Sequence, residues 1–180
     1  MPNTKTIVRE FDAIALYKAL DMQRRKRGLT WRQVADEIWD QSADLNRQRG
    51  DHPISPSTLT TIAKRGDTTC QHALFILRWL GSAPESFLSP ALPTSKSAAL
   101  PPIGLDRRLR WDLPALYVAL DTQRRDKQLT WMSLAKELHC SEHQLKGIKR
   151  ARFAIGMKLA EQIVQWLNRP ASAFVYIAMW

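Results

Sequence analysis

The sequence predicts an all-α protein built from two tandem copies of one five-helix unit. The segment LYKALDMQRRKRGLTW, which begins at Leu16, recurs as LYVALDTQRRDKQLTW from Leu116. Aligning residues 11–38 with residues 111–138 gives 15 identities in 28 positions without a gap. In both copies apolar residues recur at three- and four-residue steps, as on one face of a helix, and no stretch alternates convincingly with period two. A repeat of about 70 residues is too long for a solenoid and fits a duplicated domain.

The two copies differ in length and are joined by a segment of different composition. The first copy carries 14 extra residues between Ile38 and Ser55. Between the copies lies SPALPTSKSAALPPIG, residues 89–104, which is rich in Pro, Ser and Ala and predicts a semi-extended linker. We therefore expect a first domain over residues 6–88 and a second domain over residues 105–180.

The first two helices of each copy are marked by residues that favour helix ends. In the second copy Asp112 is a suitable N-cap, and Pro114 follows in the first turn, where proline is tolerated. In the first copy this helix is expected to end near Gly28. Thr30 then caps a second helix and forms a capping box with Gln33, and the second copy repeats the threonine.

The remaining helices follow in the same order in both copies. A third helix is expected to start at Ser55, with Pro56 at its first position, and at Ser141 in the second copy. A fourth is expected over about residues 69–80 and 155–167, and a short fifth follows each of these. The apolar end of the chain, FVYIAMW, either closes the second core or forms an exposed docking tail.

The charge of the chain indicates a polyanionic partner. The net charge is +10, and Lys and Arg outnumber Asp and Glu by 13 to 10 up to Pro90 and by 14 to 7 after it. A basic surface suits nucleic acid, an anionic membrane surface or an acidic protein, although it can also serve solubility alone. No apolar run has the length of a membrane span, the N-terminus does not resemble a signal peptide, and two cysteines provide no disulfide framework. We expect a soluble cytoplasmic protein with no membrane partner.

The sequence does not favour an enzyme. Its four histidines are scattered, and no nucleophile, acid pair or phosphate loop has a recognisable spacing. The segment HCSEH brings His139, Cys140 and His143 close together, but three weakly placed ligands are poor evidence for zinc. Cys140 is better explained as a small buried residue in a turn. No metal, cofactor or catalytic residue is therefore expected.

The segment LTWMSLAKELHCSEHQLKGI, residues 129–148, resembles the helix-turn-helix of the phage-repressor-like family, also called the Xre or Cro family. The resemblance is carried by a small residue where two helices cross and by apolar residues around the turn and along the inner face of the next helix: Ala135, Leu138, Cys140, Leu145 and Ile148. The downstream AEQIVQWLNRPASAF resembles the fourth and fifth helices of the family. This implies two tandem lambda-repressor-like domains that bind double-stranded DNA, as in a transcriptional regulator.

Two positions depart from the family pattern. Four residues before Ala135 the family usually has Gln, whose amide binds a DNA phosphate, whereas this chain has Trp131 and, in the first copy, Trp31. An indole N–H can donate to phosphate but cannot accept, and the alternative is that both rings pack against the first helix. The turn glycine is replaced by His139 and Trp39, and a non-glycine residue adopts the left-handed conformation at some cost.

The insertion makes DNA contact by the first copy less direct. WDQSADLNRQRGDHPI replaces the two turn residues of the second copy. The second helix is expected to continue to Arg49 and to stop at Gly50. Arg47 and Arg49 could then reach a phosphate or the other domain, or they are a solvated helix end.

In a fold of this type the third helix enters the major groove with its N-terminal residues on base edges. The DNA-contacting candidates in the second copy are Glu142, His143, Lys146 and Arg150 for bases, and Lys149 and Arg152 for phosphates. The equivalents in the first copy are Ser57, Thr58, Thr61, Lys64 and Arg65. A solvated basic face would look similar. The repeated Arg24–Arg25 and Arg124–Arg125 pairs either complement a helix dipole or contact phosphate.

The duplication suggests a pseudo-dimer within one chain. Repressors of this class place two recognition helices about one DNA turn, roughly 34 Å, apart, and a covalent duplication can supply both. Because the copies have diverged, an asymmetric operator is expected. The alternative is a protein-interaction module that has lost DNA readout. In a mixed case the second domain binds DNA, and the first holds a protein partner or another copy of the chain.

Overall fold

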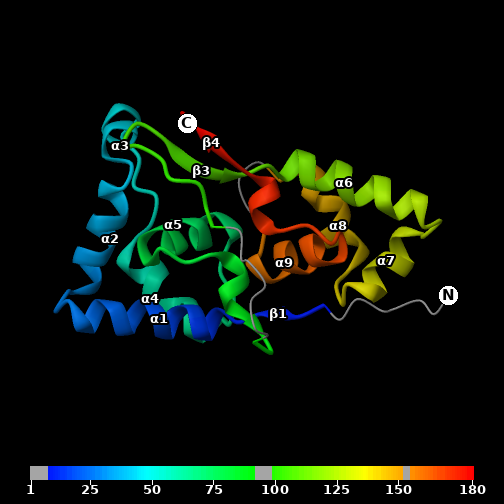
Figure 1. Cartoon of the computed structure of the whole chain (residues 1–180), viewed down its shortest axis with the longest axis horizontal. Helices are drawn as coiled ribbons and strands as arrows, with labels where there is room; N and C mark the ends of the chain where they lie inside the picture. Colours follow the sequence, from blue (N-terminus) through cyan, green and yellow to red (C-terminus); the bar gives the residue numbers. More distant parts are fainter. Residues whose placement is uncertain (1–7, 92–98, 152–154) are drawn as a thin grey trace.

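The computed structural model describes residues 8–91, 99–151 and 155–180. Over these ranges the chain is mostly helical, with two small two-stranded antiparallel sheets (Figure 1). The expected helical character is therefore confirmed, and the sheets are an addition that the sequence did not predict. None of the described helices combines the length and the apolar character needed to cross a membrane.

The two halves of the chain repeat one order of elements. The first half contains β1 (Glu10–Phe11), α1 (Ala13–Lys26), α2 (Trp31–Asp40), α3 (Ala43–Arg49), α4 (Pro56–Arg65), α5 (Cys70–Leu80), the 3-10 helix η1 (Pro84–Phe87) and β2 (Leu88–Ser89). The second contains β3 (Arg108–Trp111), α6 (Leu113–Asp126), α7 (Trp131–Glu137), α8 (Glu142–Gly147), η2 (Ile148–Arg150), α9 (Met157–Trp166), η3 (Ala171–Phe174) and β4 (Val175–Ala178). The halves differ in α3, which the insertion adds, and in η2, which extends α8.

Several helix ends lie where the sequence predicts them. Asp112 caps α6 by accepting a hydrogen bond from the amide of Ala115 at 3.0 Å. Thr30 and Gln33 form both bonds of a capping box at the start of α2. Gly28 follows α1 with φ of +66°, a conformation that costs glycine little.

Each sheet joins the start of a half to its end. Phe11 of β1 pairs with Leu88 of β2, and Trp111 of β3 pairs with Val175 of β4. Strands of two to four residues are too short to show an alternating pattern, which is why they were not predicted. β4 covers the second core with Ala178, whereas the last two side chains, Met179 and Trp180, are exposed, so the C-terminal segment closes the core except at its tip.

The halves meet through matched contacts. Thr69 and Gly156, which precede α5 and α9, form an antiparallel bridge. The amide of Cys70 donates to the carbonyl of Ile155 at 2.7 Å, and the amide of Met157 donates to the carbonyl of Thr68 at 2.8 Å. The repeat makes these two bonds equivalent. The donor Cys70 corresponds to the donor Met157, and the acceptor Ile155 corresponds to the acceptor Thr68. The contact therefore has the reciprocal pattern of a two-fold dimer interface.

The first strand of each half also packs against a helix of the other half: β1 against α9, and β3 against α5. Gln71 on α5 donates from Nε2 to the carbonyl of Leu109 at 2.8 Å. On the opposite side Gln165 on α9 donates from Nε2 to the carbonyl of Arg9 at 2.7 Å and accepts from its amide at 2.8 Å. The buried apolar residues form one cluster that includes both halves. The two sequence repeats are thus packed on a shared core.

The insertion folds into a separate helix. The sequence predicted one helix as far as Arg49, but α2 ends at Asp40 and α3 begins at Ala43; the predicted stop at Gly50 is confirmed by its φ of +66°. The break follows from Ser42, which is buried and whose hydroxyl donates to the carbonyl of Arg107 at 2.6 Å while it accepts from Arg78 at 2.9 Å. Both partners lie far away in the sequence, so local patterns could not reveal the break.

A buried arginine of the second half forms hydrogen bonds with the insertion. Arg108 of β3 donates to Asn46 at 2.6 Å and to Asp51 at 2.9 Å. Burial of the Asp51 carboxyl tends to raise its pKa, but the bonds from Arg49 and Arg108 outweigh burial and hold the pKa below its ordinary value. Arg47 pairs with Asp44 on the surface of α3. The arginines of the insertion are therefore engaged within the protein.

Candidate nucleic-acid interface

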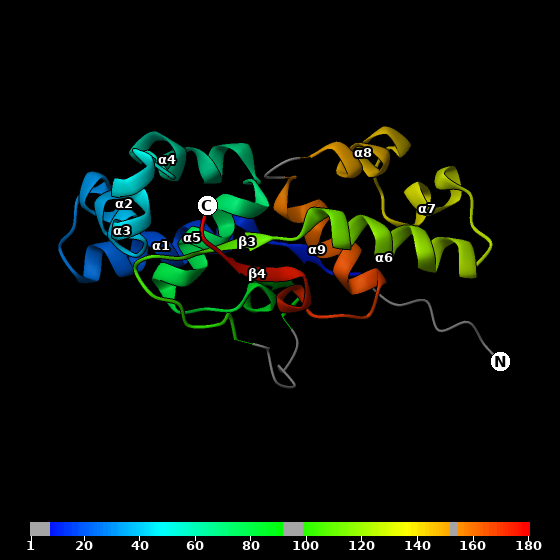
Figure 2. The same ribbon diagram turned by 90° about the horizontal axis from the view of Figure 1, so that it is seen from above.

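The two helices expected to contact DNA lie on the same side of the molecule. Figure 2 shows α4 and α8 along the upper edge, one in each half. α2 and α7, which precede them, lie at the two ends of the same view. A ligand as long as a DNA duplex could therefore meet both halves from one direction.

The start of α8 is fixed by its turn and its cap. His139 adopts φ of 51°, the left-handed conformation expected at the place of the turn glycine. Ser141 and Gln144 form both bonds of a capping box, and Leu145 is fully buried beneath the helix. Trp39, the expected equivalent of His139, instead lies within α2, because the insertion lets that helix continue past the turn position.

A basic groove of about 490 Å³ lies between α6, α7 and α8. Its lining residues come from all three helices and from η2: Tyr117, Trp131, His143, Lys146, Gly147, Lys149 and Arg150. Lys149 and Arg150 are exposed and form no ion pair within the described part of the chain, whereas Lys146 pairs with Glu142. Three cations around one concave surface favour an anionic ligand.

An aromatic stack forms the wall of this groove. The Trp131 ring stacks on Tyr117 of α6 with centroids 5.7 Å apart and planes 17° apart. The Arg124 guanidinium lies 4.5 Å from the centroid of Trp131 and is itself held by Asp121 and by the carbonyl of Leu129. The stack orients the Trp131 ring at the groove. The packing of Trp131 against the first helix, which was one of the two alternatives for this ring, is thus confirmed.

The same stack recurs in the first half. Tyr17 and Trp31 have centroids 5.6 Å apart, and Arg24 lies 4.6 Å from the Trp31 ring. The first arginine of each repeated pair is therefore a packing residue. The second arginine of each pair, Arg25 and Arg125, is exposed and forms an ion pair with an aspartate of its own helix.

The indole N–H groups of six of the seven tryptophans are of two kinds. Four tryptophans donate to an acceptor in the protein: Trp39, Trp79, Trp111 and Trp166. Trp31 and Trp131 find no acceptor for their indole N–H among the described residues. Both can therefore pack on the first helix and still have a donor for a ligand.

The equivalent helix of the first half offers fewer cations. Ser57 and Thr58 share hydrogen bonds with the hydroxyl of Ser55 at 2.9 Å each, and Thr61 bonds the carbonyl of Thr58. At the end of α4 the exposed cations are Lys64 and Arg65, which form no ion pair with a described residue. The polar candidates of this half are thus partly engaged in local bonds.

Two further expectations concern the region around α8. Arg152 lies outside the described residues. The weak zinc candidates His139, Cys140 and His143 belong to the described residues. Among these residues, no three or more His, Cys, Asp or Glu side chains are arranged so that they could hold a metal ion. Burial raises the pKa of the half-buried Cys140 thiol.

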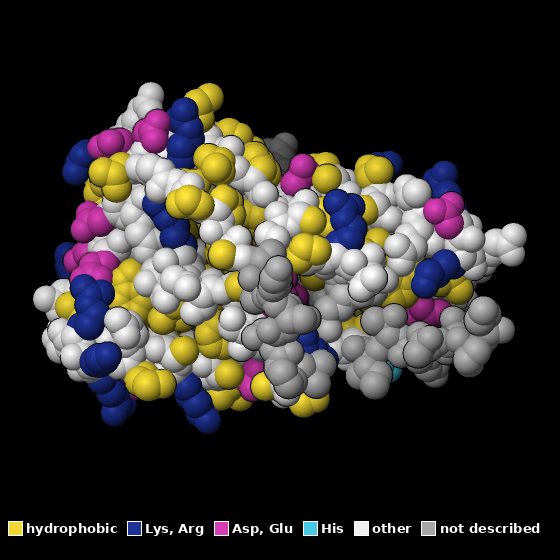
Figure 3. All heavy atoms as spheres, viewed as in Figure 1, with side chains coloured by type: hydrophobic (Ala, Val, Ile, Leu, Met, Phe, Trp, Pro, Cys, Tyr) yellow, Lys and Arg dark blue, Asp and Glu magenta, His cyan; other side chains and the backbone are white. Residues whose placement is uncertain are grey.

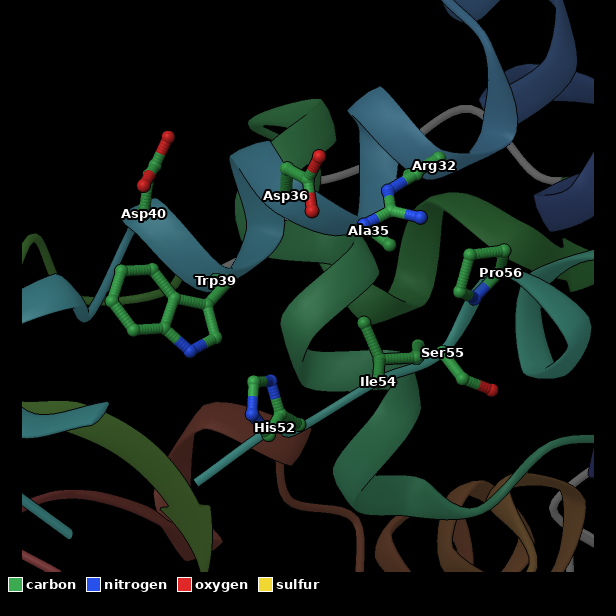
Figure 4. Close-up of a pocket in the computed structure, with 9 residues that line it drawn as sticks. All are labelled: Arg32, Ala35, Asp36, Trp39, Asp40, His52, Ile54, Ser55 and Pro56. Carbon is green, nitrogen blue, oxygen red and sulfur yellow. The ribbon is translucent and has the colours of Figure 1, made fainter. Parts of the chain in front are cut away.

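A second groove, which the sequence did not predict, lies beside α2, at the edge of the molecule where Figure 3 shows Asp and Glu side chains, and involves Asp36 (Figure 4). Alone, Asp36 looks like an ordinary exposed helix residue. A comparison of the copies could have drawn attention to it, because the second copy has Lys136 at the same place.

No protein-family model, no curated protein and no solved structure matches the chain. The function is therefore inferred from the geometry and chemistry of the grooves.

Proposed function

We propose that the chain binds double-stranded DNA sequence-specifically through two covalently linked helix-turn-helix domains, which act as a pseudo-dimer in transcriptional regulation. The observation that carries the proposal is the basic groove at α8, which lies on the side of the molecule that also presents α4 (Figure 2). The resemblance of residues 129–148 to the phage-repressor-like family supports the same function.

In this proposal α8 enters the major groove. His143 and Lys146 near its N-terminus reach base edges, and Glu142 exchanges its ion pair with Lys146 for a base donor. Arg150, a base candidate in the sequence, lies in η2 beyond the end of α8, so we assign it together with Lys149 to phosphates, which position the protein without reading sequence. The stacked Trp131 donates its unpaired N–H to a phosphate of the same strand.

The two halves contribute unequally. The N-caps Ser55 and Ser141 set the offset between the two helices, and it moves the equivalents by one residue from those named from the sequence. At the places of Lys146, Lys149 and Arg150, the first half has Thr60, Ala63 and Lys64. Only one of these three positions keeps its cation in the first half, so the second half supplies more of the phosphate contacts. The two-fold pattern of the contact between the halves suits paired half-sites, and the divergence of the helices makes those half-sites unlike.

The proposal is tested by selecting binding sites from a random duplex library with the full-length protein. We expect two unlike half-sites with centres about 10 base pairs apart. If about six phosphates are contacted, the logarithm of the binding constant should fall with the logarithm of salt with a slope of about −5. A single selected half-site would limit DNA binding to one domain, and the absence of any enriched sequence would contradict the proposal.

Replacing Trp131 with phenylalanine tests the indole donor. Phenylalanine preserves the stack on Tyr117 but removes the N–H, so we expect about ten-fold weaker DNA binding, the effect of losing one hydrogen bond to a charged acceptor. Trp31→Phe is the matched variant in the other half. Binding is measured with the selected duplex at one salt concentration, and thermal unfolding checks that both variants are folded. Unchanged affinity of Trp131→Phe would mean that the Trp131 ring only packs against the protein and does not donate to DNA.

A further inference from the structure

Residues 9–11 form a short strap that crosses α9 of the second half (Figure 1). The amide of Arg9 donates to the side chain of Gln165 at 2.8 Å, and its carbonyl accepts from the same side chain at 2.7 Å. Glu10 forms an ion pair with Lys158 at 2.6 Å. Within its own half the strap pairs with β2 over two residues, and a two-stranded sheet of this length is weakly stable by itself.

Glu161 lies on the face of α9 that the strap covers. It follows Lys158 by three residues and precedes Gln165 by four, so the three side chains share one side of the helix. Glu161 is 0% exposed, and neither of its carboxyl oxygens has a hydrogen-bond partner among the described residues. Glu85 of η1, whose charge acts on Glu161, adds a third buried carboxyl oxygen without such a partner. Two carboxyl groups thus meet where the halves join.

The charges on the strap do not neutralise Glu161. Arg9 is the cation that acts on its carboxyl, but the Arg9 guanidinium bonds to a backbone carbonyl beyond β2 at 3.3 Å. Glu10 is already paired with a lysine of α9. Burial therefore prevails and, together with the charge of Glu85, raises the pKa of Glu161 to about 8.

The other elements packed on α9 direct their described charges elsewhere. α5 contacts α9, but its Arg78 bonds to Gln41 and its His72 to the backbone of Pro53, both in the first half. η3, which also contacts α9, contains no titratable side chain. A proton is therefore what keeps the buried carboxyl neutral beneath the closed strap.

The other side of the contact has the same strand without the carboxyl. β3 lies across α5 in the equivalent way, with Leu109 at the place of Arg9. Leu74, which is fully buried, stands at the place of Glu161. β3 also pairs with β4 over four residues instead of two. One strand is thus closed by apolar packing, whereas the shorter one is closed over a group that can ionise.

Ionisation of a buried carboxyl is unfavourable unless water reaches it, and the strap is the short, weakly anchored cover of Glu161. The closed state binds the Glu161 proton more tightly than an open, hydrated state, so a rise in pH favours opening. We infer that the strap is a proton-controlled lid, which stays closed on α9 while Glu161 is protonated and opens when Glu161 ionises. This role is separate from the DNA binding proposed above.

Trypsin cleavage after Arg9 of the full-length protein measures how often the strap opens, because the protease must take the strand off α9 to bind it. Initial rates between pH 6 and 9 are followed by mass spectrometry and divided by those for a free peptide of residues 6–13, which corrects for the pH dependence of trypsin. With a pKa of 4.5 in the open state and about 8 in the closed state, the corrected rate should rise about 50-fold from pH 6 to pH 8. Cleavage after Arg110 in β3, corrected in the same way, is the internal control and should be slower at every pH.

Three variants identify the group that responds to pH. Glu161→Gln stays neutral and should abolish the rise of the corrected rate. Glu85→Gln keeps an acceptor for its backbone partner but removes the neighbouring charge, so the rise should become smaller. Lys158→Gln removes the ion pair with Glu10 and leaves the carboxyls in place, so cleavage should be faster at every pH with the same relative rise. Carbon-13 spectra of the Glu161 carboxyl, assigned with Glu161→Gln, follow its ionisation directly.

Several results would overturn the inference. A corrected rate that stays constant while Glu161 ionises would show that the closed protein accommodates the charge. An equal rise in wild type and in Glu161→Gln would assign the response to another group. Equal corrected rates after Arg9 and Arg110 would show that the whole protein unfolds rather than the strap alone. Ionisation of Glu161 near pH 4.5 would show that its carboxyl is already hydrated. None of these results depends on whether the protein binds DNA.

Discussion

Replacing both Lys149 and Arg150 with glutamine is expected to weaken binding to the selected DNA site about 100-fold. Each side chain is exposed at the basic groove and is free of ion pairs with described residues. A hydrogen bond to a charged group contributes roughly 1.5–3 kcal/mol, and two exposed contacts at the lower end of this range, about 3 kcal/mol together, give an effect of this size. The salt dependence should also become less steep by about two, because two phosphates would no longer be neutralised by the protein.

A matched variant separates these two side chains from a general effect of net charge. Lys18 and Lys26 are exposed cations of α1 that form no ion pair with a described residue. Replacing both with glutamine changes the net charge by the same amount and should have a much smaller effect on DNA affinity. Because all four side chains are exposed, thermal unfolding should change little in either variant. Equal decreases of affinity in the two variants would show that Lys149 and Arg150 contribute only through the net charge of the protein.

Replacing Glu161 with leucine is expected to stabilise the protein, and more so as the pH rises. Glu161 on α9 is fully buried, and neither of its carboxyl oxygens has a hydrogen-bond partner among the described residues. Burial raises its pKa to about 8; the negative charge of Glu85 adds to the increase, and Arg9 partly offsets it. The equivalent residue of the first half, Leu74, is a buried leucine, so the fold accepts that side chain at this place.

The sign of the pH effect follows from the two states. The unfolded chain releases the Glu161 proton near the ordinary pKa of 4.5, whereas the folded chain holds it up to about pH 8. The contribution of this proton to stability is therefore complete below pH 4.5 and is lost as the pH rises toward 8. The loss is on the order of 4 kcal/mol over this window. Glu161→Leu removes it, so the free-energy difference between variant and wild type should widen with pH.

Denaturant unfolding at a series of pH values between about 5 and 8 measures this difference. Glu161→Gln is a second neutral variant that keeps the side-chain shape and should show the same trend. The reciprocal change Leu74→Glu places a carboxyl at the equivalent buried position and should destabilise the protein increasingly with pH. Parallel pH profiles for wild type and Glu161→Leu would mean that Glu161 is solvated in the folded protein.

The local parts of the fold were predictable from the sequence. N-caps such as Thr30 and Ser141 form hydrogen bonds with residues three positions further along the chain, so a short stretch of sequence is enough to predict them. The break at Ser42 depends on Arg78 and Arg107, which lie far away along the chain. A pattern that looks only at neighbouring residues cannot include such partners.

The candidate site was predictable to a similar extent. The cations of η2 are adjacent in the sequence and could therefore be recognised as a basic segment. The structure places Lys149 and Arg150 at one groove with Trp131. The role of Arg124 could not be assigned, because its stacking on Trp131 needs the three-dimensional position of both side chains. The groove beside α2 was missed for the same reason, since its lining residues come from α2 and from the separate segment between His52 and Pro56.

The reciprocal contact between the halves has a consequence for how this molecule can change. In a dimer of identical subunits every substitution occurs twice, so a change that helps one side must be tolerated by the other. One polypeptide with two diverged copies is free of this constraint. A carboxyl can be buried at Glu161 while Leu74 stays apolar, and one half can gain 14 residues while the other keeps a two-residue turn. Such a chain can retain an older task in one half while the other evolves a new one.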